Sequence, residues 1–419
     1  MNARRIQPLA TLDSEVTIPG SKSLTARALM IGALASGDSL LKNPLRAEDT
    51  EYMIQGLEAL GVQIEKPPDG LLICGTGGKL SPPSEPIFLG GAGTAVRFLT
   101  TAVGLCGVEV VIDGNQRMRE RPIQDLLEAL KPLGIVARSM NGNGCPPVVV
   151  ENVQFEGGQT TLRGSKSSQF LSSILLSSPY ARNGVEVEVT QGLVSQSYVD
   201  LTMGIMTDFG CQVEHEDHRI FRILPGSYHG REYRIEGDMS SASYFLAAAA
   251  VTGGRIRVKG ICPHSKQGDK GFPDVLEAMG CRVRRDDSSI EVIGGPLRGV
   301  DVDMKTMPDS VQTLAVVAAF ARGTTRISQV EHLRYKETDR LAALKRELRR
   351  IGIQADVEEK TLVVQGGDPQ EAEIDTYQDH RMAMAFAVAG LRVPGISIRD
   401  PGCVNKSFPT FWTLMEGLR

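Results

Sequence analysis

Two helical patterns alternate along the chain and return six times at intervals of about 70 residues. The first is rich in small residues and opens on a polar cluster, at Ser21-Lys22-Ser23, Gly93-Thr94, Ser167-Ser168-Gln169, Ser240-Ser241, Asp309-Ser310 and Asp379-His380-Arg381. The second is amphipathic and ends on a glycine, at Gly61, Gly134, Gly210, Gly280, Gly352 and Gly417. Self-similarity at a fixed period indicates a repeat architecture.

Short strand-like segments follow the first five of these glycines, at residues 62–64, 135–136, 211–213, 281–283 and 353–355. Turn signals behind several of them predict a returning hairpin strand. Each glycine stands where a helix C-terminus requires one. The pattern therefore predicts an α/β (α+β) protein of six similar units, which fall most simply into two domains of three.

The division between the two domains follows from the sixth unit, which lacks a strand after Gly417. We expect residues 16–18, which precede the first unit, to supply that strand. The predicted domains are therefore 20–236 and 1–19 plus 237–419. The chain would cross between them near Pro19-Gly20 and again near Glu236-Gly237, which predicts a hinge.

Composition supports a soluble globular protein. Of the 419 residues, 41% are hydrophobic, 23% charged and 5% aromatic, and the net charge of −4 argues against non-specific nucleic-acid binding. Seven cysteines without a CxxC pair indicate reduced thiols in the cytoplasm. No apolar stretch approaches the ~20 residues of a membrane span, and residues 1–20 contain no apolar leader.

The helix openings are candidate anion sites, because helix N-termini attract negative charge and six of them can face one place. Lys22 and Arg27 add cations to the first opening, although an ordinary serine cap explains the same residues. Three glycines, 90, 91 and 93, allow a ligand to approach the second opening closely. The shared phase within the repeat favours a binding site.

Charged clusters elsewhere have two interpretations. Three arginines within residues 117–121 are typical of a solvated face, but Arg121-Pro122 before a helix also suits a carboxylate or phosphate. Glu337 and Arg340 are three residues apart and are compatible with a plain surface ion pair. His215 and His218 have no cysteine partners at ligand spacing, so we expect no metal site.

Several motifs together resemble the 5-enolpyruvylshikimate-3-phosphate (EPSP) synthase family, almost from end to end. They are Gly20-Ser21-Lys22-Ser23 with Arg27, Gly93-Thr94-Ala95-Val96-Arg97, Glu120-Arg121-Pro122-Ile123, Ser167-Ser168-Gln169, Lys336-Glu337-Thr338-Asp339-Arg340, Asp379-His380-Arg381-Met382-Ala383-Met384 and Lys406-Ser407-Phe408-Pro409. The resemblance implies the two-domain enolpyruvyl transferase fold, with three βαβαββ repeats in each domain and the active site in the cleft between domains.

The resemblance also implies the reaction, the transfer of the enolpyruvyl group of phosphoenolpyruvate to the 5-hydroxyl of shikimate 3-phosphate, without a cofactor or metal. The implied catalytic residues are Asp309, Glu337 and Lys22. The implied shikimate 3-phosphate residues are Ser23, Arg27, Ser167, Ser168, Gln169, Ser195, Tyr198, Asp309, His332 and Lys336. The implied phosphoenolpyruvate residues are Lys22, Gly93, Arg121, Gln169, Arg340, Arg381 and Lys406.

Two other functions fit the same fold. A UDP-N-acetylglucosamine enolpyruvyl transferase typically carries a reactive cysteine in the loop that corresponds to residues 113–121, and this loop has none. A non-catalytic anion-binding protein would be favoured by loss of Asp309, Glu337 or Lys22, and all three are present. We expect a cytoplasmic monomer that binds no nucleic acid or membrane and is inhibited by glyphosate, which occupies the family's phosphoenolpyruvate site.

Three positions depart from the family pattern. Gly91 replaces a common asparagine, His332 replaces another, and Phe98 replaces a usual proline. The loss of an amide donor at Gly91 is expected to weaken phosphoenolpyruvate binding. Gly91→Asn should then lower the KM for phosphoenolpyruvate several-fold, since one added hydrogen bond contributes about 1 kcal/mol. An unchanged KM in steady-state assays would reject this idea.

Overall fold

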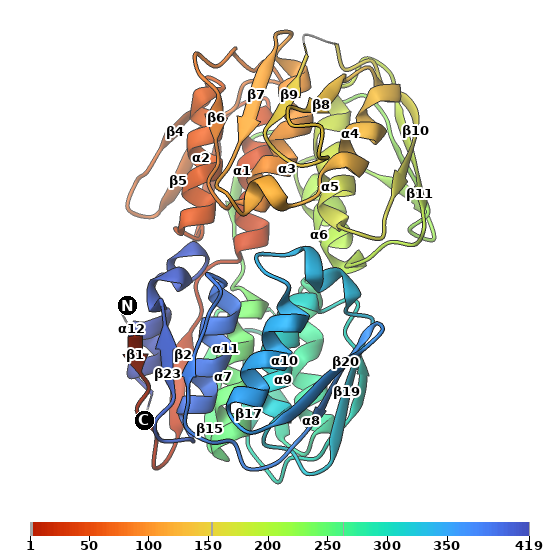
Figure 1. The fold of residues 1–419 in the computed structure, drawn as a ribbon. Coiled ribbons are helices and arrows are strands. Elements are labelled where there is room, and N and C mark those ends of the chain that lie inside the picture. The colour runs from red at the N-terminus through yellow and green to blue at the C-terminus, as the bar shows by residue number, and fades with distance from the viewer. Residues whose placement is uncertain (1–2, 152–153, 263, 419) are drawn as a thin grey trace. The chain divides into compact units, whose positions relative to one another are not determined.

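The computed structural model describes residues 3–151, 154–262 and 264–418, and its chain divides into two compact units. The N-terminal unit is Gly20–Ile235, and the C-terminal unit joins Met1–Pro19 to Glu236–Arg419. The chain passes between the units after Pro19 and again after Ile235. Glu236, which the sequence assigned to the first domain, belongs to the C-terminal unit. Figure 1 labels the elements of both.

Each unit is built from three βαβαββ repeats, as predicted. Within the described residues, five sheets have four strands and one has three. In each four-stranded sheet the first and second strands are parallel, and the fourth strand lies antiparallel between the second and the third, as in the order β10-β11-β13-β12. The two helices of each repeat connect these strands.

The N-terminal unit contains the first three repeats. The first is β14 (Glu232–Arg234), α1 (Lys22–Leu34), β3 (Ser39–Lys42), α2 (Glu48–Ala59), β4 (Gln63–Glu65) and β5 (Gly70–Cys74). The second is β6 (Ile87–Phe88), α3 (Gly93–Ala102), η1 (Val103–Leu105), β7 (Val110–Asp113), η2 (Met118–Glu120), α4 (Gln124–Leu130), η3 (Lys131–Leu133), β8 (Ala137–Ser139) and β9 (Val148–Val150). The third is β10 (Gly158–Arg163), α5 (Ser168–Ser177), η4 (Ser178–Tyr180), β11 (Val185–Thr190), α6 (Gln196–Asp208), β12 (Glu214–Glu216) and β13 (Ile220–Ile223).

The C-terminal unit contains the other three. The fourth repeat is β2 (Asp13–Thr17), α7 (Met239–Thr252), β15 (Arg255–Lys259), η5 (Gly268–Gly271), α8 (Phe272–Ala278), β16 (Arg282–Arg285) and β17 (Ser289–Ile293). The fifth is β18 (Asp301–Asp303), η6 (Pro308–Ser310), α9 (Val311–Ala318), β19 (Thr324–Ser328), η7 (Glu331–Tyr335), α10 (Arg340–Arg350), β20 (Gln354–Glu358) and β21 (Thr361–Gln365). The sixth is β22 (Glu373–Ile374), α11 (His380–Gly390), β23 (Ser397–Arg399), η8 (Pro401–Lys406), α12 (Phe411–Glu416) and β1 (Ala3–Arg5).

The segment around residues 16–18 does not complete the sixth repeat, so that prediction is wrong. It belongs to β2, which lies parallel to β15 as the first strand of the fourth repeat, while β1 pairs antiparallel with β23 in the sixth. The physical reason is the crossing itself. Only three residues separate the crossing from helix α7, which is too short a stretch to form a first strand directly before that helix. Strand β14 fills the corresponding place beside β3 in the first repeat.

Five of the six predicted helix-ending glycines adopt the left-handed conformation, with φ between 80° and 114° at residues 61, 134, 210, 280 and 352. A Cβ is strained in this region, which explains the choice of glycine. Gly417 differs: its φ is −76°, so α12 ends without a left-handed residue. The glycine signal is therefore correct for the five repeats that continue into a strand.

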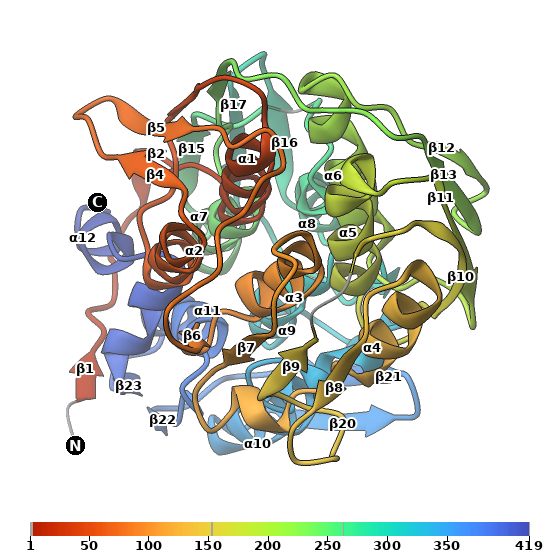
Figure 2. The same ribbon diagram turned by 90° about the horizontal axis from the view of Figure 1, so that it is seen from above.

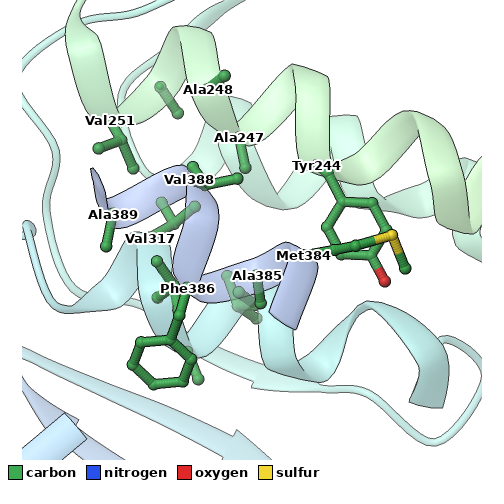
Figure 3. Packing of buried hydrophobic residues seen from close by; sticks show 14 of the residues in the cluster. Tyr244, Ala247, Ala248, Val251, Val317, Met384, Ala385, Phe386, Val388 and Ala389 are labelled. Carbon is green, nitrogen blue, oxygen red and sulfur yellow. The ribbon is translucent and has the colours of Figure 1, made fainter. Parts of the chain in front are cut away.

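The small-residue helices form the centre of each unit. In the C-terminal unit α7, α9 and α11 pack against one another, and Figure 3 shows Ala247 and Ala248 of α7 beside Val388 and Ala389 of α11. Alanine allows the helix backbones to approach closely, and large buried side chains such as Tyr244 and Phe386 complete the core. In the N-terminal unit α1, α3 and α5 occupy the equivalent places, as Figure 2 shows. Since each central helix follows the first strand of its repeat, their polar openings gather at one end of each unit.

No helix in the described part of the chain is long and apolar enough to cross a membrane.

Candidate active site

The first polar opening of the N-terminal unit holds a lysine beside an aspartate. Ser21 caps α1 and its hydroxyl accepts a hydrogen bond from the amide of Leu24 at 3.4 Å. The Nζ of Lys22 lies 2.9 Å from Oδ2 of Asp49 in the first turn of α2, with both side chains largely buried. The ion pair restricts the lysine to the helix opening, where its charge adds to that of the helix N-terminus.

Arg27, one turn further along α1, is buried among three helices. Its Nε donates to Oγ1 of Thr202 at 2.8 Å, and its Nη2 donates to the carbonyl of Tyr198 at 3.0 Å. Its Nη1 donates to the carbonyl of Ser23 at 2.9 Å, and the ring of Phe98 lies 5.4 Å from the guanidinium. Burial lowers the pKa of Arg27 to about 10, so the residue stays charged at neutral pH. A fixed buried cation of this kind suits recognition of an anionic or hydroxylated ligand.

The openings of α3 and α5 lie next to each other. Ser167 caps α5 by accepting from the amide of Gln169 at 3.2 Å, and the Gln169 side chain donates to Oγ1 of Thr94 at 3.1 Å. The guanidinium groups of two arginines meet at the first residue of α3: a Cβ on Gly93 would lie 2.4 Å from Nη1 of Arg97 and 2.7 Å from Nη1 of Arg121. Both arginines are buried, so positive charge is concentrated at this helix N-terminus.

Gly93→Ala is therefore expected to displace the two guanidinium groups and to raise the KM for an anionic substrate bound at the α3 opening by about tenfold or more, in line with about 1–3 kcal/mol for overpacking. Steady-state kinetics check this effect. Gly226→Ala is the matched control, because the nearest atom to its added Cβ is Sγ of Cys211 at 3.8 Å. A variant that keeps the wild-type KM would show that the arginines do not hold this substrate.

The arginine-rich loop divides into surface and site residues. Arg117 pairs with Glu120, and Arg119 pairs with Asp113; Arg119 is exposed and Arg117 is partly exposed. Arg121 is only 5% exposed, so the solvated-face interpretation holds for its two neighbours and fails for Arg121 itself. The other predicted residues of this unit lie at helix openings: Ser168 begins α5, Ser195 precedes α6 with a left-handed φ of 54°, and Tyr198 lies in the first turn of α6.

In the C-terminal unit, Arg340 lies at the centre of three carboxylates. The residue begins α10 and is 1% exposed. Its Nε donates to Oδ2 of Asp379 at 2.7 Å, and its Nη2 donates to Oε2 of Glu337 at 2.8 Å. Its Nη1 donates to Oδ1 of Asp309 at 3.2 Å. Burial lowers the pKa of Arg340, but the three carboxylates outweigh burial and hold the pKa above its ordinary value.

Asp309 also contacts a second arginine. Nη2 of Arg381 lies 2.9 Å from Oδ2 of Asp309, and Nη1 of Arg381 donates to the Asp309 carbonyl at 3.1 Å and to the Tyr244 hydroxyl at 3.3 Å. Asp379 caps α11, and its Oδ1 accepts from the amide of Arg381 at 2.9 Å. These contacts join the openings of α7, α9 and α11 into one cluster of alternating charges.

The remaining predicted residues of this unit lie close by in the chain or the fold. His332 lies in η7 and is 1% exposed; burial, followed by the charge of Lys336, lowers its pKa to about 3, so the imidazole is neutral at physiological pH. Lys406 ends η8, which packs against α11. The interpretation of Glu337 and Arg340 as a surface ion pair is wrong, because the side chains are 16% and 1% exposed.

Sequence reasoning missed several polar residues of these clusters. Asp49, Tyr244 and Asp269 lie outside the quoted motifs, and only the shared repeat phase of Ser240 pointed toward this part of α7. The structure adds them because they come from neighbouring repeats. Among the described residues, no three His, Cys, Asp or Glu side chains are grouped so that they could hold a metal ion.

Comparison with known proteins agrees with this geometry. The model of the EPSP synthase (3-phosphoshikimate 1-carboxyvinyltransferase) family matches residues 6–415. A 3-phosphoshikimate 1-carboxyvinyltransferase of Nostoc punctiforme is 46% identical over 406 residues, covering 96% of this chain and 95% of that protein. One of Methanoculleus marisnigri is 44% identical over 416 residues, covering 99% and 98%.

Solved structures give the same result. The EPSP synthase of Acinetobacter baumannii aligns with a TM-score of 0.83 at 27% identity, over 100% of this chain and 98% of that one. The enolpyruvyl transferase NikO of Streptomyces tendae, at a TM-score of 0.77 and 18% identity over 100% and 98% of the two chains, shares the fold. Fold and clustered charges thus define an enolpyruvyl transferase. The chain belongs to the EPSP synthase (3-phosphoshikimate 1-carboxyvinyltransferase) family, and it is a transferase.

Proposed function

We propose that this chain transfers the enolpyruvyl group of phosphoenolpyruvate to the 5-hydroxyl of shikimate 3-phosphate and releases inorganic phosphate. The observation that carries the proposal is the buried contact of Asp309 and Glu337 with Arg340, because two carboxylates beside a fixed cation suit acid–base chemistry on an anionic substrate. The family to which the chain belongs supports the same reaction.

The residues divide by ligand in this proposal. Phosphoenolpyruvate contacts Lys22, Gly93, Arg121, Gln169, Arg340, Arg381 and Lys406. Shikimate 3-phosphate contacts Ser23, Arg27, Ser167, Ser168, Gln169, Ser195, Tyr198, Asp309, His332 and Lys336. The substrates carry two phosphates and several other oxygen groups near one reacting carbon, which explains the need for many fixed cations. Both units contribute residues to this assignment.

The reaction begins with protonation of the phosphoenolpyruvate methylene carbon by Glu337, which creates positive character at C2. The 5-hydroxyl of shikimate 3-phosphate attacks C2 while Asp309 takes its proton. The tetrahedral adduct then loses phosphate as the ionised Glu337 takes a proton back from the methyl group, which restores the double bond and regenerates the acid. Lys22 assists by stabilising charge on the phosphate that departs. The reaction requires water to be excluded, because water would otherwise capture the reactive carbon.

The charge on Glu337 changes with substrate binding in this proposal. In the structure Arg340 bonds to Glu337 and favours its ionised form. A substrate carboxylate at Arg340 shares the same guanidinium, which reduces the stabilisation of negative charge on Glu337. Substrate binding thereby favours the protonated acid that the first step requires. The arrangement couples proton donation to the presence of phosphoenolpyruvate.

The same site explains the remaining expectations. We propose glyphosate as an inhibitor at the phosphoenolpyruvate residues, since it is also a small molecule with a carboxylate and a phosphonate. Each unit has its own buried core, which supports a monomer. All seven cysteines are unpaired, which supports a cytoplasmic location.

The test is phosphate release by the purified protein with phosphoenolpyruvate and no added metal. Shikimate 3-phosphate and UDP-N-acetylglucosamine are compared as acceptors. Release that requires shikimate 3-phosphate supports the proposal. The proposal is overturned if phosphate release requires UDP-N-acetylglucosamine, or if no phosphate is released with either acceptor. The comparisons do not favour the rival acceptor, because the matching family model and the similar curated proteins are of the shikimate enzyme.

A further inference from the structure

Asp269 is a buried carboxylate that the proposed mechanism does not use. It lies in η5, before α8, and is 4% exposed. Its Oδ1 accepts a hydrogen bond from the Ser310 hydroxyl at 2.7 Å, and its Oδ2 accepts one from the Ser240 hydroxyl. Asp269 thus links the opening of α7 to the η6 turn before α9. Ionising a buried carboxylate whose hydrogen bonds come from neutral hydroxyl groups costs free energy. This cost suggests that Asp269 has a function.

Through this hydrogen bond, Asp269 holds Ser310, the residue that directly follows the proposed base, Asp309. Ser310 directly follows Asp309 in the η6 turn, and both are held by groups from other helices. Loss of the Ser310 bond would release one side of this turn. Because general-base catalysis depends on sub-ångström placement, the bond has a direct effect on the reaction.

The segment that carries Asp269 is itself fixed at the crossing between the units. The Gln267 side chain donates to the Gly237 carbonyl at 2.9 Å and accepts from the Met239 amide at 3.2 Å. Gln267 also donates to Oε1 of Glu236 at 3.0 Å. Asp269 therefore extends from an anchored segment and does not depend on a free loop.

Charge provides a second connection to Asp309. Two arginines bond to the Asp309 carboxylate, and they weaken it as a base by stabilising its negative form. The negative charge of Asp269 has the opposite effect, because it disfavours the negative form of Asp309 and so strengthens Asp309 as a base. Burial, followed by the negative charge of Asp309, raises the pKa of Asp269 to about 6, and the same repulsion acts on Asp309 in return. When Asp269 is ionised, its negative charge opposes the effect of the arginines on Asp309.

Other charged groups near Asp269 do not cancel this effect. Arg381 of α11 lowers the pKa of Asp269, but less than burial and Asp309 raise it. Lys270 follows in η5 and is exposed. Asp274 of the adjacent α8 is exposed and pairs with Arg285. The carboxylate that acts most strongly on Asp269 is therefore Asp309.

We propose that Asp269 is a positioning residue for the transfer reaction: it fixes the Asp309 turn through Ser310, and its negative charge strengthens Asp309 as a base. The inference rests on the proposed role of Asp309. It adds a residue that lies outside every motif of the chain and acts through Ser310 and Asp309.

Asp269→Asn keeps the shape and removes the charge. We expect kcat to fall by about 10- to 100-fold, with the KM for each substrate changed less than about threefold. Loss of a like charge makes Asp309 easier to ionise, so the acidic limb of the kcat–pH profile should move to lower pH by about half a unit or more. A merely structural role would leave that limb in place.

Glu347→Gln is the matched control. Glu347 is a buried carboxylate of the same unit that accepts from the Tyr377 hydroxyl at 2.6 Å and pairs with Arg350 at 2.9 Å. The Glu347→Gln variant should have a lower free energy of unfolding, but the acidic limb of its kcat–pH profile should not move. If Asp269→Asn shows the same profile as Glu347→Gln, the inference is overturned.

Two hydroxyl variants keep the test decisive if Asp269→Asn does not fold. Ser310→Ala frees the turn and should lower kcat at all pH values. Ser240→Ala removes a hydrogen bond that favours the charged form of Asp269, so kcat should fall more near pH 6 than near pH 8. Wild-type profiles for both would reject the inference. Full activity of Asp309→Asn would instead reject Asp309 as the base, and phosphate release that does not require shikimate 3-phosphate would reject the proposed function, so the failures are distinguishable.

Discussion

Asp309→Asn is expected to abolish turnover, lowering kcat by about 10²- to 10⁴-fold, the usual contribution of a general base. The amide cannot take the proton of the 5-hydroxyl, while its size and planar shape preserve packing in the η6 turn. Binding of shikimate 3-phosphate should persist, because Arg27 and the serines of the N-terminal unit remain. Stopped-time phosphate assays measure the first effect, and isothermal titration calorimetry measures the second.

The control for this variant is Asp301→Asn. Asp301 begins β18 in the same repeat and is exposed, so it shares the chemical change and lacks the arginine contacts. It should retain wild-type kcat. If Asp309→Asn also retains it, Asp309 has no part in the chemistry, and the proposed assignment of base and acid fails with it.

Arg340→Met is expected to lower the free energy of unfolding by about 3–5 kcal/mol, the cost of removing one partner from a buried ion pair. Methionine fills much of the volume but leaves Asp379, Glu337 and Asp309 with less positive charge around them. The measurement is the denaturant midpoint of the variant beside wild type. Activity should be lost as well, because the same guanidinium is proposed to bind phosphoenolpyruvate.

The loss of stability in Arg340→Met should depend on pH. Without Arg340, the buried carboxylates hold protons more tightly in the folded state than in the unfolded one. A raised folded-state pKa of an acid means that stability is present at low pH and is lost as the pH rises. The deficit of Arg340→Met relative to wild type should therefore be smaller at pH 5 than at pH 8.

Arg349→Met provides the comparison within the same helix. Arg349 is 50% exposed and pairs with Asp356, so its removal should cost less than about 1 kcal/mol. If both variants lose the same free energy of unfolding, the buried cluster around Arg340 contributes no more to stability than an exposed ion pair does.

The repeat architecture was readable from the sequence because its signals are local. Small-residue helices, cap residues and left-handed glycines each follow from interactions within a few residues. Six repetitions made each weak signal strong, and five of the six glycines adopt the expected conformation. The motif strings likewise led to the family that the comparisons show.

The strand exchange was not readable, because partners in a sheet are chosen over long sequence distances. Strand β2 pairs with β15 across more than two hundred residues, and nothing in residues 13–17 specifies the fourth repeat over the sixth. Because the chain crosses directly before α1 and directly before α7, the first and fourth repeats have no strand immediately before their first helix. Strands β14 and β2 fill those places.

The same division holds for the candidate site. By itself the sequence determined which polar residues open helices, since capping and helix-end charge are local properties. The tertiary structure alone decided that Arg340 is buried among three carboxylates and that Asp269 lies beside the Asp309 turn. Burial and contact between repeats depend on how α7, α9 and α11 pack, and packing sets both the charge state and the position of each group.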